Sequence, residues 1–379
     1  MERHHRVQIL DVMRGFAVVV MVLGHSIDAV LSDEARRTDL FVLYDAVRGF
    51  TAPMFLFVAG AAFLVGSARR WDDYRSFSPA LAKRLSRIAL LFFVGYALHF
   101  PFFSLNKLLH DTSPAEYAQM LQVDVLHCAA AGLLLLQVLV LLSPSAAAMA
   151  RRATVLAALA AVATPFVWSV DWGPLLGAAI APYVNQHQPS IFPLFPFAGF
   201  VLAGAAAGHH YLRARAAGRE QALFRSAAIA GTALVAAGLA FELAPVRILP
   251  ALDFWKTSPN FFLMRLGCVL LVTAGFGLVR GIPGRVQRHV TALGQSSLLV
   301  YAVHLLLVYG SAANDGLAQV VGRTLRYDAA LLVGLSVLLL MLSLVHGWAR
   351  LRSHHEGPSN VLRYGLASTL TYFFLTKPW

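Results

Sequence analysis

The stretch LDVMRGFAVVVMVLGHSID, residues 10–28, is almost wholly apolar but contains four ionisable side chains, Asp11, Arg14, His25 and Asp28. Ionisable groups inside a membrane helix cost about 2.5–3.5 kcal/mol each on insertion scales, and where they occur they mark functional sites. In a helix, Arg14 and His25 lie about 20° apart around the axis and roughly 16 Å apart along it. The stretch therefore predicts a first membrane helix with a polar stripe through about half of the hydrocarbon core.

The composition of the chain is that of a polytopic membrane protein. Of its 379 residues, 58% are apolar and 13% are charged, whereas soluble proteins average about 25% charged residues. The net charge of +12 lies mostly in short loops, where it sets membrane orientation, so nucleic acid is not an expected partner. Cys128 and Cys268 lie in apolar stretches and no CxxC or HExxH motif occurs, so we expect neither a disulfide nor a metal site.

Apolar runs of about 20 residues recur along the chain and predict an all-α fold with about ten transmembrane helices. The predicted spans are residues 9–30, 42–67, 85–104, 119–142, 153–170, 192–212, 223–243, 260–280, 295–313 and 329–350. Most loop arginines and lysines fall on the side of the basic N-terminus, which predicts that both termini are cytoplasmic. We expect a multi-pass protein of the inner membrane. We expect a transmembrane domain over residues 1–350 and a cytoplasmic or interfacial tail over residues 351–379. Gly204 and Gly208, four residues apart, predict close helix packing.

This topology distributes the polar residues unevenly across the membrane. Asp11 and Arg14 lie toward the cytoplasm, whereas Tyr301 and His304 lie near the middle of the ninth span. The remaining candidates lie in the outer halves of their spans: His25, Asp28, Asp45, Arg48, Asp124, His127 and Arg265. We assign Asp45, Arg48, Asp124, His127 and Arg265 to binding of a polar substrate from outside.

Each of these residues also has a structural explanation. Asp11 with Arg14, and Asp45 with Arg48, are three residues apart in the chain and could neutralise each other. Arg265 is close enough to an interface to extend its charged end into water. Asp124 with His127, and His304 alone, could hold helices together by hydrogen bonds.

The chemistry that fits the first span is general-base catalysis. A histidine can take a proton from a hydroxyl or amine near neutral pH, and a carboxylate one turn away can orient it. His25 and Asp28 are spaced for that arrangement. Arg14 offers a permanent charge and a fork of donors for a phosphate or a carbonyl. We therefore predict His25, Arg14 and Asp28 as catalytic residues, with Arg14, His304 and Tyr301 binding an extended donor.

The spacing of Arg14 and His25, ten residues between them in a first membrane helix, resembles the signature of the acyltransferase-3 family. Four other stretches resemble a sister group, the bacterial proteins similar to the catalytic domain of heparan-α-glucosaminide N-acetyltransferase. They are APMFLFVAGAAF (52–63), VDVLHCAAAGLL (123–134), IFPLFPFAGFVLAG (191–204) and LGQSSLLVYAVHLLLVYG (293–310). The sister group's lysosomal enzyme has asparagine in place of His25 and a histidine shortly after it. Residues 31–40 contain no histidine, so His25 is expected to act as in the acyltransferase-3 family.

The resemblance implies a transmembrane acyltransferase with acetyl-CoA or another acyl-CoA as cytoplasmic donor and a sugar or glycan acceptor on the other face. The partners expected are membrane lipid, the acyl donor and a carbohydrate-like acceptor, with a homodimer left open. The alternative hypothesis is a proton-coupled transporter, in which the Asp, His and Arg residues form a relay. A non-catalytic membrane partner would leave the outer-half charges unexplained.

Overall fold

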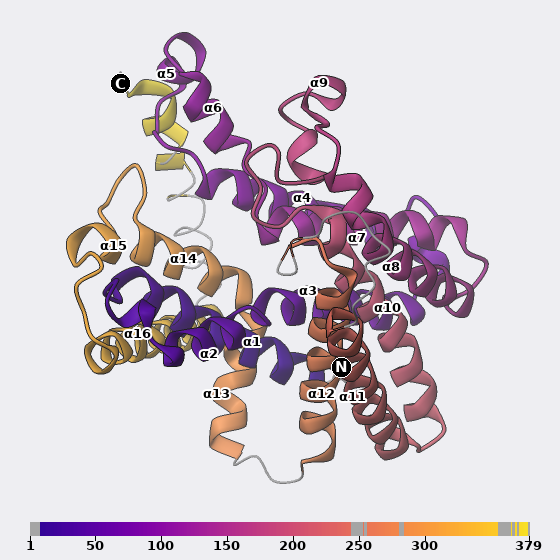
Figure 1. Ribbon diagram of the computed structural model, residues 1–379. Helices are drawn as coiled ribbons and strands as arrows, with labels where there is room; N and C mark the ends of the chain where they lie inside the picture. The colour runs from indigo at the N-terminus through magenta and orange to yellow at the C-terminus, as the bar shows by residue number, and fades with distance from the viewer. Residues whose placement is uncertain are drawn as a thin grey trace. The chain divides into compact units, whose positions relative to one another are not determined.

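The computed structural model describes residues 8–243, 253, 256–279, 284–354, 365, 368–369 and 371–377. The basic residues 1–7 and most of the predicted tail, residues 351–379, lie outside the described residues. The described part consists of helices joined by loops, with isolated bridges and no strand, which confirms the all-α prediction (Figure 1). The chain forms two compact units. The first contains Met1–Met13, Gly49–Tyr96 and Leu121–Ile282, and the second contains Arg14–Arg48, Ala97–Met120 and Pro283–Trp379.

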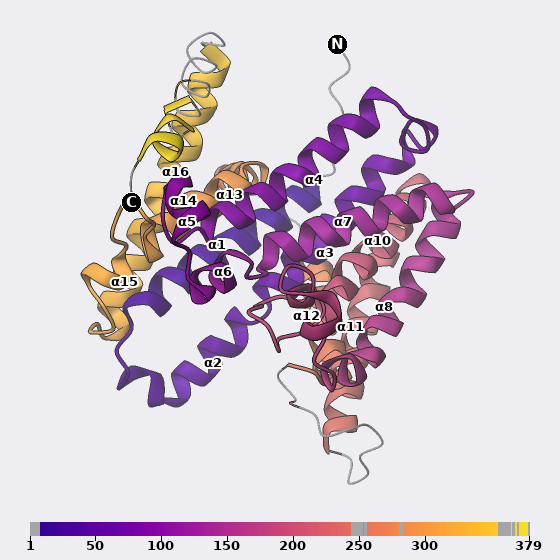
Figure 2. The ribbon, with the colours of Figure 1, turned by 90° about the horizontal axis from the view of Figure 1, so that it is seen from above.

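The first unit is a bundle of long helices. Its helices are α3 (Thr51–Ala68), α4 (Pro79–Leu98), α7 (Val125–Leu142), α8 (Ala146–Trp168), α10 (Leu194–Ala216), α11 (Glu220–Leu243) and α12 (Pro259–Leu278). Helices α7, α8 and α10 lie side by side in Figure 2, and α11 packs along α12. A Cβ on Gly204 would lie 1.9 Å from the Phe57 carbonyl oxygen, and one on Gly208 2.7 Å from that of Ala61. The two glycines thus let α10 touch the backbone of α3, which confirms the predicted close packing.

The second unit contains the rest of α1 (Gln8–Val30), with α2 (Asp39–Arg48), α5 (Leu105–His110), α6 (Pro114–Met120), α13 (Gly284–Gln295), α14 (Ser297–Tyr309), α15 (Leu317–Val320) and α16 (Tyr327–His354). A Cβ on Gly15 would lie 1.9 Å from the Val290 carbonyl oxygen, so α1 and α13 are in backbone contact there. At the other end of α1, Val30 and Leu31 are fully buried in a cluster with Val308 of α14. Helix α1 is therefore held near both of its ends by the α13–α14 segment.

Each of the ten predicted spans overlaps a helix, but several predicted boundaries differ from the structure. Helix α4 begins and ends six residues before the predicted span 85–104, and α8 begins seven residues before the predicted span 153–170. Span 42–67 is two helices, α2 and α3. The fourth span begins at Val125 rather than residue 119, because an extended segment precedes α7. The ninth span is α14, which meets α13 at a bend of 80°.

By length and composition, the described residues contain seven helical segments that can cross a membrane, with Asp39–Ala68 (α2 and α3) taken as one, or eight if the bent α13–α14 pair is one span. Helices α4 and α10 are not among them. The protein is thus a polytopic helical membrane protein, and the count of ten spans stays a prediction.

The described end of the tail packs within the second unit against the segment that follows α4. The Ser104 hydroxyl donates a 2.7 Å hydrogen bond to the Lys377 carbonyl oxygen, and the ring of Phe374 contacts Phe100 and Phe103. The predicted topology placed Phe100, Phe103 and Ser104 at the outer end of the third span, and the tail in the cytoplasm or at its membrane interface. Residues in contact share one side of the membrane, so these two expectations cannot both be right.

A cysteine-labelling experiment tests this contact. In intact vesicles, Lys377→Cys and Leu109→Cys should react with a membrane-impermeant maleimide from the same side, since Leu109 is exposed on the loop next to the tail contact. The two endogenous cysteines are buried or half-buried, so the unsubstituted protein gives the background. Labelling of the two cysteines from opposite sides would show that the tail does not pack on this loop.

The loop also contains a local ion pair outside the spans. Lys107 Nζ lies 2.6 Å from Glu116 Oε1, and the Ser113 backbone N–H donates to the same carboxylate. The Lys107 and Ser113 hydrogen bonds lower the pKa of Glu116 to about 2. The contact between α5 and α6 is therefore intact at all mildly acidic and neutral pH values.

Candidate functional site

His25 lies in the second half of α1 and contacts α14 of the same unit. Its Nδ1 atom lies 3.0 Å from the phenol oxygen of Tyr309, the last residue of α14. The ring of His304, also on α14, lies beside it, with the two centroids 5.4 Å apart. Helices α1 and α14 thus bring two imidazoles and one phenol together inside the second unit.

Asp28, one turn after His25, forms ion pairs with two arginines. Its Oδ1 lies 2.9 Å from Arg36 Nη1, and its Oδ2 lies 2.9 Å from Arg48 Nη1. Arg36 also donates to the Asp28 carbonyl oxygen. The Asp28 side chain is 20% exposed, and those of Arg36 and Arg48 are 17% and 33% exposed. The carboxylate therefore ties the end of α1 to η1 (Ala35–Arg37) and to the end of α2.

The predicted pair of Asp45 and Arg48 exists but does not stand alone. Arg48 Nη2 lies 2.6 Å from Asp45 Oδ1 while its other terminal nitrogen binds Asp28. The hydroxyl of Tyr44 donates a 2.7 Å hydrogen bond to the Gly24 carbonyl oxygen, next to His25. Helix α2 therefore lies against the His25 turn of α1, with a chain of two carboxylates and two guanidinium groups along it.

Asp28 was predicted to orient His25, and the structure shows a different hydrogen bond to the ring. The partner of His25 Nδ1 is the Tyr309 hydroxyl, whereas the Asp28 carboxylate binds two arginines. If the Tyr309 oxygen accepts from Nδ1–H, the other ring nitrogen, Nε2, presents a lone pair. Tyr309 can thus fix the tautomer that a general base requires.

Arg14 lies on the same unbroken helix as His25, eleven residues earlier. The helical rise separates the two by roughly 16 Å along the axis, as predicted. Arg14 is half-buried and directly precedes Gly15, the residue in backbone contact with Val290 of α13. Its role in binding the donor stays a prediction.

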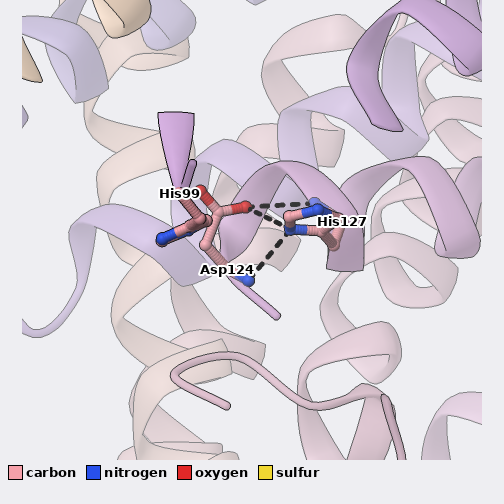
Figure 3. Close-up of side chains that lie close together, drawn as sticks. All are labelled: His99, Asp124 and His127. Atoms are coloured by element: carbon pink, nitrogen blue, oxygen red, sulfur yellow. Dashed lines mark hydrogen bonds and ion pairs between the residues drawn. The ribbon is translucent and has the colours of Figure 1, made fainter. Parts of the chain in front are cut away.

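Asp124 and His127 belong to the first unit and begin α7. Asp124 is the N-cap: its Oδ1 accepts hydrogen bonds from the backbone N–H groups of Leu126 and His127, at 2.8 and 3.2 Å. Figure 3 shows the contacts between Asp124 and His127. The His127 ring lies 2.9 Å from the same oxygen through Nδ1 and packs against Tyr96, with centroids 4.2 Å apart. A capping box at a buried helix start satisfies otherwise unpaired backbone groups, so the geometry favours the structural explanation for this pair.

Arg265 also lies in the first unit. Its guanidinium carbon is 3.9 Å from the ring centroid of Phe261, one turn earlier on α12, and 5.9 Å from that of Phe197 on α10. Stacking on aromatic faces stabilises a guanidinium in a partly buried position. This stacking does not test whether Arg265 binds substrate, and that role stays a prediction.

Three residues of the second-unit cluster were absent from the predicted site: Tyr309, Arg36 and Tyr44. Tyr309 follows His304 by five residues in an otherwise apolar run, so the pattern Tyr–His–Tyr was a visible signal. Arg36 lies in the loop after α1, where a cation by itself indicates only membrane orientation. Its link to Asp28 depends on a tight 3-10 turn, which the sequence does not specify.

The fold is that of a helical membrane protein. Its second unit contains a cluster of histidine, tyrosine and ion-paired side chains among apolar residues. The sequence matches the acyltransferase-3 family, described as an acyltransferase domain, over residues 7–348. The chain therefore belongs to the acyltransferase-3 family and is a membrane acyltransferase, which confirms the family resemblance carried by Arg14 and His25. A search of curated proteins gives no significant match.

Proposed function

We propose that this protein transfers a small acyl group, acetyl, from cytoplasmic acyl-CoA to a sugar or glycan acceptor on the extracytoplasmic face. The observation that supports this most directly is the His25–Tyr309 hydrogen bond inside the second unit. A neutral imidazole with one nitrogen held by a phenol is suited to remove a proton from a hydroxyl or amine.

In the proposed reaction, Tyr309 accepts from His25 Nδ1–H, and His25 Nε2 takes the proton of the acceptor hydroxyl or amine. The acceptor oxygen or nitrogen forms a bond to the thioester carbonyl carbon. The carbon–sulfur bond then breaks, and the CoA thiolate takes the proton from His25. The residue is thus restored after each transfer. Asp28, neutralised by Arg36 and Arg48, holds the α1 turn that positions His25.

Arg14 is proposed to bind the donor at the cytoplasmic end of α1. Replacing Arg14 with lysine should weaken acyl-CoA binding about tenfold, because lysine retains the charge but lacks the forked donors. The dissociation constant of acyl-CoA for the purified protein measures this effect. If Arg14 only neutralises Asp11, replacing both by leucine should restore binding and stability together, and that rescue would contradict the donor role.

The acceptor is proposed to bind near Asp45 and Arg48. These side chains are 52% and 33% exposed, lie in the same unit as His25, and offer acceptors and donors to a polar hydroxylated ligand. The CoA nucleotide carries several negative charges and would have to stay at the cytoplasmic surface, near the basic loops. The pantetheine arm is then the part that reaches His25.

A thiol-release assay separates the enzyme from the transporter hypothesis. Purified protein mixed with acetyl-CoA and a panel of sugars and amino sugars should liberate free CoA in proportion to an acylated product. A transporter would release no thiol above the protein-free rate. Absence of release with every acyl-CoA and acceptor in the panel would contradict the proposed function.

A further inference from the structure

His304 has an unused hydrogen-bonding atom in the interior of the second unit. The residue is 0% exposed, and its Nε2 has no hydrogen-bond partner among the described residues. Its Nδ1 lies 2.8 Å from the carbonyl oxygen of Val300, one turn earlier in α14. A carbonyl only accepts, so Nδ1 bears the hydrogen and Nε2 of the neutral ring presents a lone pair.

The hydrogen bond of His304 does not join two helices. The hydrogen bond of His304 stays within α14, so the residue joins no second helix through its ring nitrogens in the described part of the chain. A buried acceptor without a partner loses the hydrogen bonds it makes with water, a cost that a leucine or phenylalanine at this position would avoid. A buried polar atom left in this state points to a ligand that completes it.

The surroundings of His304 restrict what that ligand group is. The centroid of the His304 ring lies 5.4 Å from that of His25 and 5.9 Å from that of Tyr301, so the ring lies beside the proposed reaction centre. The ligand group must be a donor, O–H or N–H, because the His304 lone pair only accepts. In the proposed reaction the reacting hydroxyl of the acceptor gives its hydrogen to His25, so that hydroxyl is not the donor to His304.

An acyl-CoA supplies a second donor at the same place. Its pantetheine arm has an amide N–H two carbons from the thioester sulfur, whatever acyl group or acceptor is used. We propose that His304 Nε2 accepts a hydrogen bond from this amide N–H and so positions the thioester beside His25. This inference rests on the proposed function, and it adds that His304 binds the amide group of the donor's pantetheine arm.

The test is a double substitution in ligand and protein. The ligands are S-acetyl-N-acetylcysteamine, which contains this amide, and its ester counterpart, in which oxygen replaces the N–H. Each competes with radiolabelled acetyl-CoA for the purified protein. The wild type should prefer the amide by about 2- to 10-fold, the value of one net hydrogen bond.

In His304→Leu this preference should fall to about 1, while both ligands still compete. His304→Gln places an amide oxygen near the Nε2 position and should retain part of the preference. Val308→Ala is the matched control, since it removes buried volume from α14 without a polar group, and it should keep the wild-type preference.

The outcomes are distinguishable. No binding of acetyl-CoA to the wild type would overturn the proposed function together with this inference. Acetyl-CoA binding with no amide preference, or with the same preference in His304→Leu, would overturn the role of His304 alone and leave the acyltransferase proposal standing.

Discussion

Replacement of His25 by alanine should lower acyl transfer by about 10²- to 10⁴-fold, the usual effect of losing a general base. The loss should appear in kcat, because the imidazole acts on the proton in the transition state rather than on donor binding. The dissociation constant of acyl-CoA should change little. Steady-state thiol release and direct acyl-CoA binding, measured on the same preparation, separate the two.

His110→Ala is the matched control for this substitution. His110 is exposed on α5 of the same unit and has no place in the proposed reaction, so its replacement should leave transfer unchanged. Tyr309→Phe should give an intermediate loss, since it removes only the group that orients the ring. Activity of His25→Ala within a fewfold of wild type would remove His25 from the mechanism.

Replacement of Asp28 by alanine should destabilise the second unit more than any other single charge removal. It leaves Arg36 and Arg48 without the carboxylate that binds both. Breaking a buried ion pair costs about 3–5 kcal/mol; since these side chains are 17–33% exposed, we expect about 2–3 kcal/mol here. Thermal unfolding in detergent, followed by intrinsic fluorescence, measures the shift.

Asp33→Ala is the control for Asp28→Ala. Asp33 is 70% exposed and lies 4.0 Å from Arg36 and 3.6 Å from Arg323, an arrangement of low energetic value. Its loss should shift the unfolding midpoint by little. Equal shifts of the unfolding midpoint in the two variants would show that the ion pairs of Asp28 stabilise the protein no more than those of Asp33.

The sequence predicted the helical membrane class, the first helix (residues 9–30) and the family, because each depends on local apolar length or on residue spacing within one helix. Arg14 and His25 lie on one unbroken helix, so their separation followed from the helical rise alone. The packing role of Gly204 and Gly208 was predictable for the same reason.

Contacts between segments distant in the chain were not predictable in this way. Tyr309 lies 284 residues after His25, and only the packing of α14 on α1 brings them together. Asp124 was placed within a span, whereas the structure makes it the N-cap of α7 after an extended segment. A carboxylate followed three residues later by histidine fits either a site or a cap, and only the backbone distinguishes them.

The central claim is that acyl-CoA donates from the cytoplasm to an acceptor on the other face, and sealed right-side-out vesicles test it most directly. Radiolabelled acetyl-CoA is trapped inside, and the acceptor identified by thiol release is added outside. We expect label on the external acceptor, none when acetyl-CoA is supplied only outside, and none from vesicles with His25→Ala. Equal labelling from external acetyl-CoA in intact vesicles would contradict the two-sided reaction.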